Sequence, residues 1–284
     1  MAPGRLASLQ IYGTQRKTWG GRPAYNTEAV NSIDTLQETP DIETASEAYA
    51  RRFAGEAGRY FLETQESAVR SVLADLPFES VLDVGGGHGQ LVRLFLEQAR
   101  ELTVFGSDEN AHRRVRESFP HAAIRFGTGN VLRLPYSDCS FDVVVAVRLI
   151  SHIAAWQALL AELCRVARKC VIVDYPSWYS LNSLTPLLFR LKRSLEGNTR
   201  TYTSFVRSSL EQEFSRNGFG ATRCEKQFFL PMLLHRALNG ARWLQACEGG
   251  FRAVGFTALL GSPVIIRADR TTGDQAPTAA AERP

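Results

Sequence analysis

Residues 81–89 read Val-Leu-Asp-Val-Gly-Gly-Gly-His-Gly, an apolar run that leads directly into a cluster of glycines. Such a run followed by glycines predicts a strand, a tight turn and the start of a helix. Glycine carries no Cβ, so the backbone of the turn can approach a ligand closely, and the N–H groups that begin the next helix attract an anionic group. The stretch therefore predicts a ligand-binding loop at the carboxyl end of a strand.

Two classes of cofactor bind to loops of this kind, and the glycine spacing distinguishes them. Dinucleotide-binding folds use G-x-G-x-x-G, and counting from Gly85 puts Gln90 where the third glycine belongs. The chain instead carries D-x-G-x-G-x-G, formed by Asp83, Gly85, Gly87 and Gly89. A carboxylate at position 83 would repel a pyrophosphate, whereas it suits the cationic amino-acid end of S-adenosylmethionine. The spacing therefore favours S-adenosylmethionine.

Strand-like and helix-like segments alternate after this loop. The expected strands are 80–84, 102–107, 123–127, 141–147 and 170–174, with helices at 90–98, 110–119 and 154–167. This alternation predicts a Rossmann-like, doubly wound α/β sheet that is mainly parallel. Two further strand-like segments at 221–230 and 262–268 extend it, and we expect the last strand to be antiparallel.

The remaining segments flank the sheet. Residues 1–43 are polar and rich in turn residues, which predicts a flexible arm. In the main domain, 44–270, apolar residues at helical spacing predict two N-terminal helices within 44–76, separated near residues 55–58. The apolar segment 231–261 predicts a helical insertion before the last strand, and residues 271–284 predict a disordered tail.

The composition narrows the range of partners. The net charge is +4 and the basic residues are dispersed, which does not favour a nucleic-acid partner. No stretch of about 20 consecutive apolar residues or apolar signal segment occurs, so we expect no transmembrane segment and a cytoplasmic location. The 5 cysteines lack metal-ligand spacing, which predicts reduced thiols and no metal site. The oligomeric state stays open.

Three further stretches accompany the glycine loop. Residues 134–142, Leu-Pro-Tyr-Ser-Asp-Cys-Ser-Phe-Asp, resemble a stretch written LPF-p-d-x-SFD, and residues 162–166 resemble an E-x-x-RV helix. Asp108 stands at the end of the second expected strand, where an acid can accept both ribose hydroxyls. With these motifs the chain resembles the class I S-adenosylmethionine-dependent methyltransferases, especially the branch with ubiquinone and menaquinone biosynthesis enzymes.

The resemblance implies further cofactor contacts and a methyltransferase domain over 44–270. Asn130 falls where the family has its adenine-binding acid, and its amide oxygen can still accept a hydrogen bond from the adenine amino group. The N-terminal helices, with Tyr49 and Tyr60, are implied to fold over the cofactor. Two other functions stay open, an NAD-linked Rossmann oxidoreductase and a non-catalytic S-adenosylmethionine-binding module.

Residues after the fourth and fifth strands are the candidates for contact with a methyl acceptor, because ligands lie beyond the carboxyl ends of such sheets. His152 is the candidate catalytic base, with a helix cap as the alternative. Tyr175 is a candidate catalytic residue that would contact a polar group of the acceptor in the pocket, with a core position as the alternative. Methyl transfer by direct displacement mainly requires alignment, so no catalytic triad is expected. The apolar insertion predicts a small hydrophobic or aromatic acceptor, or peripheral contact with a membrane.

A basic stretch at residues 190–200 has two readings. It contains Arg190, Lys192, Arg193 and Arg200, which either bind an anionic group of the acceptor or form a solvated face.

Overall fold

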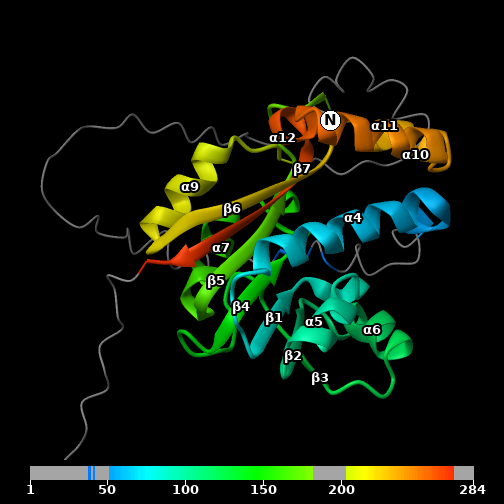
Figure 1. The fold of residues 1–284 in the computed structure, drawn as a ribbon. Helices are drawn as coiled ribbons and strands as arrows, with labels where there is room; N and C mark the ends of the chain where they lie inside the picture. The colour runs from blue at the N-terminus through cyan, green and yellow to red at the C-terminus, as the bar shows by residue number, and fades with distance from the viewer. Residues whose placement is uncertain (1–37, 40, 42–50, 182–202, 272–284) are drawn as a thin grey trace, which may run out of the picture. The chain divides into compact units, whose positions relative to one another are not determined.

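The apolar run that precedes the glycines forms the first of the described strands, and this strand lies near the centre of the sheet. The computed structural model describes residues 38, 39, 41, 51–181 and 203–271, all within the unit Gln37–Pro284. In them a seven-stranded sheet has the order β3-β2-β1-β4-β5-β7-β6 (Figure 1). Its strands are β1 (Ser80–Val84), β2 (Glu101–Gly106), β3 (Ile124–Thr128), β4 (Phe141–Ala146), β5 (Ala167–Tyr175), β6 (Phe219–Phe228) and β7 (Ser262–Arg270). β1 to β5 are parallel, and β7 is antiparallel to its neighbours β5 and β6. The predicted fold class is confirmed.

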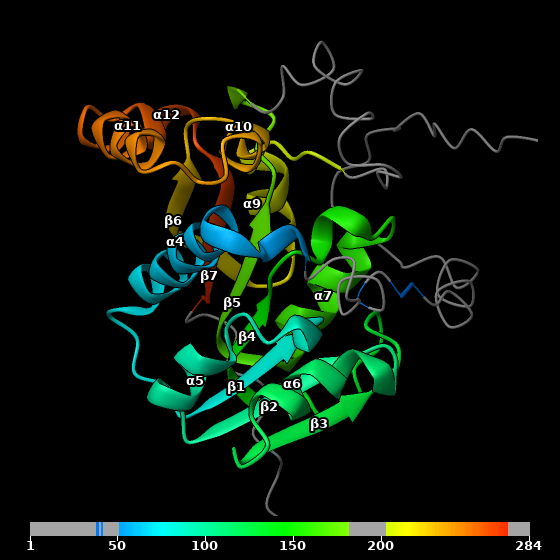
Figure 2. The same ribbon diagram turned by 90° about the vertical axis from the view of Figure 1, so that its right-hand side faces the viewer.

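Helices cover both faces of the sheet because its central strands are apolar on both sides. Every residue of β4 is buried, which explains the β-branched run at its centre, residues 143–145. One face packs against α4 (Gly55–Leu73) and α5 (Val92–Gln98), and the other against α7 (Trp156–Val166) and α9 (Arg207–Arg216). Figure 2 shows α4 and α7 on opposite sides of the strands.

The strand order places a crevice at the centre of the sheet. β1 pairs in parallel with β2 on one side and β4 on the other, so the carboxyl ends of all three lie at one edge. The chain winds outward from β1 to β3 and then returns to form β4 beside β1. Ligands of open α/β sheets bind where the winding reverses, here between the ends of β1 and β4.

The break expected near residues 55–58 lies slightly earlier in the chain. A short 3₁₀ turn, η1 (Arg51–Phe53), is followed by helix α4, which starts at Gly55. Most of the first expected helix lies outside the described residues. Gly58 lies inside α4. Glycine is required there because a Cβ at this position would collide with the backbone of Phe53. The glycine that suggested a break instead lets η1 fold back onto the first turns of α4.

The described end of the predicted flexible arm is anchored. The Glu38 carboxylate accepts hydrogen bonds from the backbone N–H groups of Ala154 (2.7 Å) and Ala155 (2.9 Å), just before α7. Asp41 is fully buried and accepts a bond of 2.6 Å from the backbone N–H of Ser107, beyond β2. The prediction of a flexible arm to residue 43 is therefore wrong at these two positions. Its other residues lie outside the described ranges.

The predicted helical insertion consists of α10 (Met232–Ala237), α11 (Arg242–Ala253) and α12 (Phe256–Leu260). It is tied to the preceding strand by Glu248, whose carboxylate accepts hydrogen bonds from the N–H groups of Phe229 and Leu230. The insertion also packs on α4, since a Cβ at Gly240 would meet the backbone of Ala57. Among the helices that the structure describes, none combines the length and apolar character needed to cross a membrane.

Candidate active site

A small, partly open cavity lies beside the glycine loop. It lies at the ends of β1 and β4, where the strand order reverses. Its lining consists of Gln65, Asp83, Gly85, Gly86, His88, Gln90, Leu91, Val147 and Arg148. The loop itself is a 3₁₀ turn, η2 (Gly86–His88), flanked by Gly85 and Gly89 with φ angles of 76° and 72°. Both flanking positions have the left-handed conformation that favours glycine.

Asp83 is a buried acid pressed against this loop. Its side chain is 3% exposed, and a Cβ on Gly86 would collide with its carboxylate. Burial raises the pKa of Asp83 to about 7, because no group in the described structure offsets the loss of water around the charge. A cationic ligand would supply that compensation. The glycine at position 86, absent from the predicted ligands, is thus the one that makes room for the acid.

The other loop glycines have separate roles. A Cβ on Gly87 would meet the backbone carbonyl of Ala111, so this glycine allows η3 (Glu109–His112) to pack against the loop. Gly89 ends the turn, and its N–H donates to the carbonyl of Gly86 over 2.8 Å. Asp83 and Gly85 line the cavity, whereas Gly87 and Gly89 support the shape of the loop.

The two predicted nucleoside contacts both make local hydrogen bonds. Asp108 lies beyond β2 and uses one carboxylate oxygen, Oδ1, to accept from the backbone N–H (2.8 Å) and side-chain amide (2.6 Å) of Asn110. The Asn130 amide oxygen accepts from the N–H of Leu132 over 2.9 Å. Their cofactor contacts stay predictions.

A polar network at the end of β4 completes the cavity. Arg148 has a left-handed φ of 62°, and its backbone N–H donates to the buried carboxylate of Asp174, whose pKa is raised by burial. The guanidinium Nε donates to Gln65 over 2.7 Å, and the same group lies 4.3 Å from the centre of the Phe53 ring. Gln65 in turn donates to Gln90 over 3.0 Å. These contacts hold a cationic group in the cavity.

The sequence offered only a partial signal for this network. Arg148 follows the fourth strand, and position alone made it a candidate for inspection. Gln65 is a glutamine within a long helix, and its sequence context does not distinguish it from the exposed polar residues of α4. His88 lines the cavity and makes an edge-on contact with Phe53, with ring centroids 5.6 Å apart.

Tyr175 is a core residue, which corrects its assignment as a pocket contact. Its side chain is 2% exposed and packs near Phe205, and burial raises its pKa well above the usual range. Arg207 and Glu211 of α9 lie close enough to influence its charge. Successive side chains of a strand point to opposite faces, so Asp174 faces the cavity network and Tyr175 faces α9.

The remaining predicted contacts lie elsewhere. Tyr60 lies against Phe228 and His235, with ring centroids 5.6 Å away in each case, and lines a separate groove rather than the cofactor cavity. Tyr49 lies outside the described residues. His152 ends the short turn η4 (Ile150–His152), half-buried and away from the cavity lining, and its role as a base stays a prediction.

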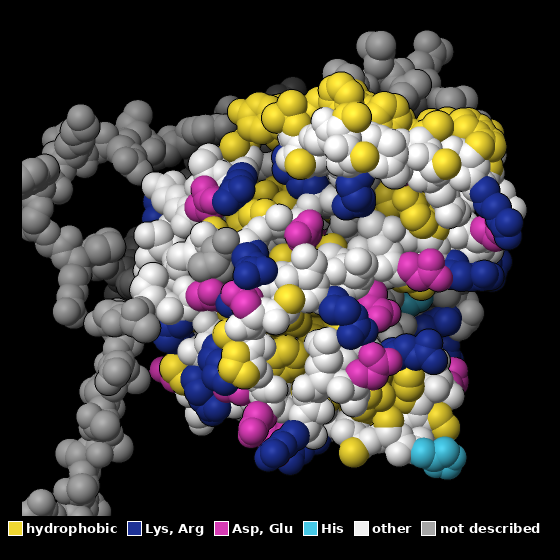
Figure 3. Space-filling model, in the orientation of Figure 1, with side chains coloured by type: hydrophobic (Ala, Val, Ile, Leu, Met, Phe, Trp, Pro, Cys, Tyr) yellow, Lys and Arg dark blue, Asp and Glu magenta, His cyan; other side chains and the backbone are white. Residues whose placement is uncertain are grey.

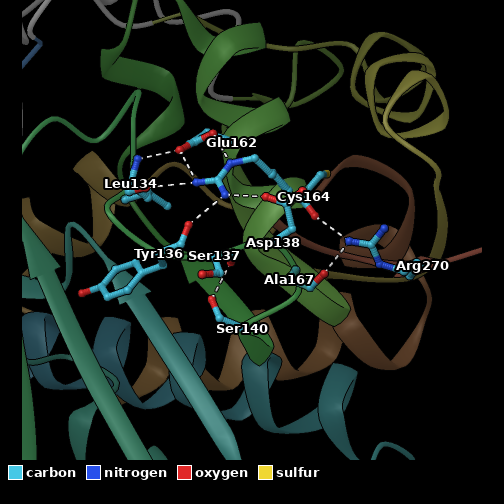
Figure 4. Close-up of polar contacts among 10 residues, drawn as sticks. Leu134, Tyr136, Ser137, Asp138, Ser140, Glu162, Cys164, Ala167 and Arg270 are labelled. Carbon is cyan, nitrogen blue, oxygen red and sulfur yellow. Dashed lines mark hydrogen bonds and ion pairs between the residues drawn. The ribbon is translucent and has the colours of Figure 1, made fainter. Parts of the chain in front are cut away.

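The motif residues of the E-x-x-RV helix stabilise the fold and do not line the cavity. Arg165 forms ion pairs with Glu162 and Asp138, each at 2.7 Å, and donates to the backbone carbonyls of Leu134 and Tyr136. Figure 4 shows these groups converging between α7 and the loop that leads into β4. Both motifs therefore fix the entry to β4, the strand that carries Arg148 at its far end.

Comparisons with known proteins agree with this geometry. Residues 82–172 match the family described as "Methyltransferase domain". The chain is 29% identical to the demethylmenaquinone methyltransferase of Deinococcus radiodurans over 60% of this chain and 80% of that protein. It is also 29% identical to the malonyl-[acyl-carrier protein] O-methyltransferase of Pectobacterium atrosepticum, over 55% of this chain and 62% of the relative.

Solved structures show the same fold. The magnesium protoporphyrin IX methyltransferase of Synechocystis PCC 6803 with bound S-adenosylhomocysteine matches with a TM-score of 0.51 and 14% identity, over 86% of this chain and 94% of that one. Its structure with bound S-adenosylmethionine matches with a TM-score of 0.50 and 14% identity, over 88% and 100% of the two chains.

The raised pKa of Asp83 predicts how cofactor affinity depends on pH. A cationic amino group binds the ionised carboxylate, which is the minor form below its pKa of about 7. The dissociation constant of S-adenosylmethionine should rise by up to about tenfold for each pH unit below 7, since the ionised fraction of the carboxyl falls about tenfold for each pH unit below its pKa. Above pH ~8 an α-amino group loses its own proton, so affinity should fall again. Calorimetric titration at several pH values measures this profile.

The matched variant for this measurement is Asp83→Asn. It should bind the cofactor more weakly and lose the acid-side limb of the profile. A wild-type dissociation constant that stays flat through pH 7, with the fold intact by circular dichroism, would show that Asp83 does not bind the cation.

Proposed function

We propose that this chain, which belongs to the class I S-adenosylmethionine-dependent methyltransferases, transfers a methyl group by direct displacement to a small hydrophobic or aromatic acceptor. The observation that carries the proposal is the buried Asp83 carboxylate packed on a glycine loop at the point where the strand order reverses. S-adenosylmethionine supplies, when bound, a methyl group already activated on a sulfonium. The protein's task is then to bind, orient and exclude water.

The charges in the cavity suit the two ends of an amino acid. Asp83 would hold the ammonium group, because a bound cation would stabilise the ionised form of this buried carboxylate, whose pKa is raised by burial. Arg148 would hold the carboxylate with its two terminal guanidinium nitrogens, since Nε is used by Gln65. The ring of Phe53 and the Gln65 amide fix the plane of the guanidinium, so little side-chain entropy is lost on binding.

An apolar cover beside the cavity supports an apolar acceptor. Phe53, Phe61 and Phe228 form a buried cluster, against which Met232 of the insertion packs. Phe53 connects this cluster to the cavity through its contacts with His88 and Arg148. A flat or apolar molecule entering along this cluster would lie beside the cofactor with water excluded.

The two other functions have less support. In an NAD-linked oxidoreductase, Asp83 would stand beside a pyrophosphate, and the third glycine would be needed at the position of Gln90. A non-catalytic binding module has no need of an apolar cluster that reaches from the cofactor cavity to the insertion.

Transfer of label from [methyl-¹⁴C]S-adenosylmethionine tests the proposed reaction. Purified protein is incubated with the organic-soluble and water-soluble fractions of a cell extract, and labelled products are identified by mass. We expect labelled product from the organic-soluble fraction. Gly86→Ala should abolish it because the new Cβ collides with Asp83, whereas Gly249→Ala, with no atom within 4 Å of its Cβ, should not. Product from the water-soluble fraction alone would contradict an apolar acceptor.

Replacing Arg148 tests its role in holding the cofactor. Arg148→Ala should weaken binding of S-adenosylhomocysteine by about 1.5–3 kcal/mol, the range for a lost hydrogen bond to a charged group. Arg100→Ala, which removes an exposed arginine at the opposite end of the strands, should bind as the wild type does. Equal dissociation constants for Arg148→Ala and wild type, measured by calorimetry, would assign Arg148 a different partner.

A further inference from the structure

The insertion presents an exposed apolar surface, here called the insertion face. Its large exposed side chains are Leu234, Leu238, Trp243, Val254, Phe256 and Leu259. Val254 is 69% exposed, Leu259 65% and Trp243 59%, so most of the surface of each of these residues faces solvent. Figure 3 shows hydrophobic side chains gathered along the edge of the molecule formed by α10, α11 and α12. A concentration of this kind marks a binding surface.

The exposed charged side chains of the insertion are arginines, and its carboxylate is buried. Residues 231–261 contain Arg236, Arg242 and Arg252, and Glu248 is the single carboxylate. Glu248 is 1% exposed, and its oxygens accept from two backbone N–H groups and from the ring of His235 over 3.1 Å. Arg242 and Arg252 are exposed. The insertion therefore offers a partner its apolar side chains and the exposed Arg242, while its own carboxylate is buried. Arg252 is exposed as a residue, but its guanidinium donates to the backbone carbonyl of Gln227 over 2.6 Å.

This combination selects among possible partners. In a two-fold dimer the same surface meets itself, so the arginines of two insertion faces would be brought together with no carboxylate to separate them. A lipid surface with anionic headgroups accepts both components, because apolar and tryptophan side chains enter the interface while arginines meet the phosphates. We propose that the insertion face docks this protein on an anionic lipid surface, with α10 to α12 lying in the plane of the interface.

Docking there would bring the cover of the active site to the lipid. Phe61 and Phe228 lie against His235 of α10, and Met232 packs on the cluster that includes Phe53. Phe53 in turn contacts the guanidinium in the cofactor cavity. If the proposed function holds, the lipid would supply an apolar acceptor on the side of the molecule where this cluster packs, although docking itself does not depend on methyl transfer.

Vesicle flotation with the full chain tests the proposal. Vesicles of phosphatidylcholine alone are compared with vesicles that also contain phosphatidylglycerol, at low and high salt. We expect binding to the anionic vesicles, weakened by salt because the arginine contribution is screened. The triple variant Trp243→Ser/Phe256→Ser/Leu259→Ser should bind at least about tenfold more weakly. Arg242→Glu should do the same, since one basic residue near an anionic surface contributes about fivefold and the reversal changes the charge by two units.

Two control variants match these changes. Leu96→Ser removes an exposed apolar side chain from α5, and Arg100→Glu makes the same charge change as Arg242→Glu at a distant position. Both should float as the wild type does, and all variants should retain S-adenosylhomocysteine binding. Absence of flotation at low salt, or flotation reduced equally by the controls, would overturn the proposal. A dimer in sedimentation that the triple variant alone abolishes would also overturn it, by assigning the face to a second copy.

Discussion

The constraint on which the site depends is the burial of the Asp83 carboxylate against the glycine loop. The acid is the last but one residue of the central strand β1, and Gly86 lacks the Cβ that would displace it. Around it, Gly87 lets η3 pack on the loop, and the parallel pairing of β1 with β4 brings Arg148 to the same cavity. The fold therefore places a buried acid and a held arginine in the lining of one cavity. We propose that the two charges of an amino acid bind these two groups.

Much of the fold could be predicted from the sequence, because hydrophobic periodicity and glycine position are local signals. The alternating segments identify the strands, and two-sided burial makes residues 143–146 of β4 an apolar run. The start of α4 could not be predicted in this way. Gly58 looked like a helix break, but it is required by a tertiary contact with Phe53 that the local sequence does not encode.

For the site, the sequence identified the loop and the acid but not the network opposite. Arg148 and Gln65 come from segments far apart in the chain, and only the packing of α4 beside the end of β4 brings them together. Tyr175 was misassigned because proximity to a strand end says nothing about which face a side chain takes, and its neighbour Asp174 takes the cavity side. The anchoring of Asp41 under Ser107 has the same origin, a buried contact between residues distant in sequence.

The central claim is that Asp83 recognises the amino group of the methyl donor. It is tested most directly by comparing the binding of S-adenosylhomocysteine with that of its analogue lacking the α-amino group, by calorimetry at pH ~7.5. The account predicts that the wild type binds the analogue at least about tenfold more weakly, since a hydrogen bond to a charged group contributes roughly 1.5–3 kcal/mol, and that Asp83→Asn discriminates far less. Equal affinity of the wild type for the two compounds would contradict it.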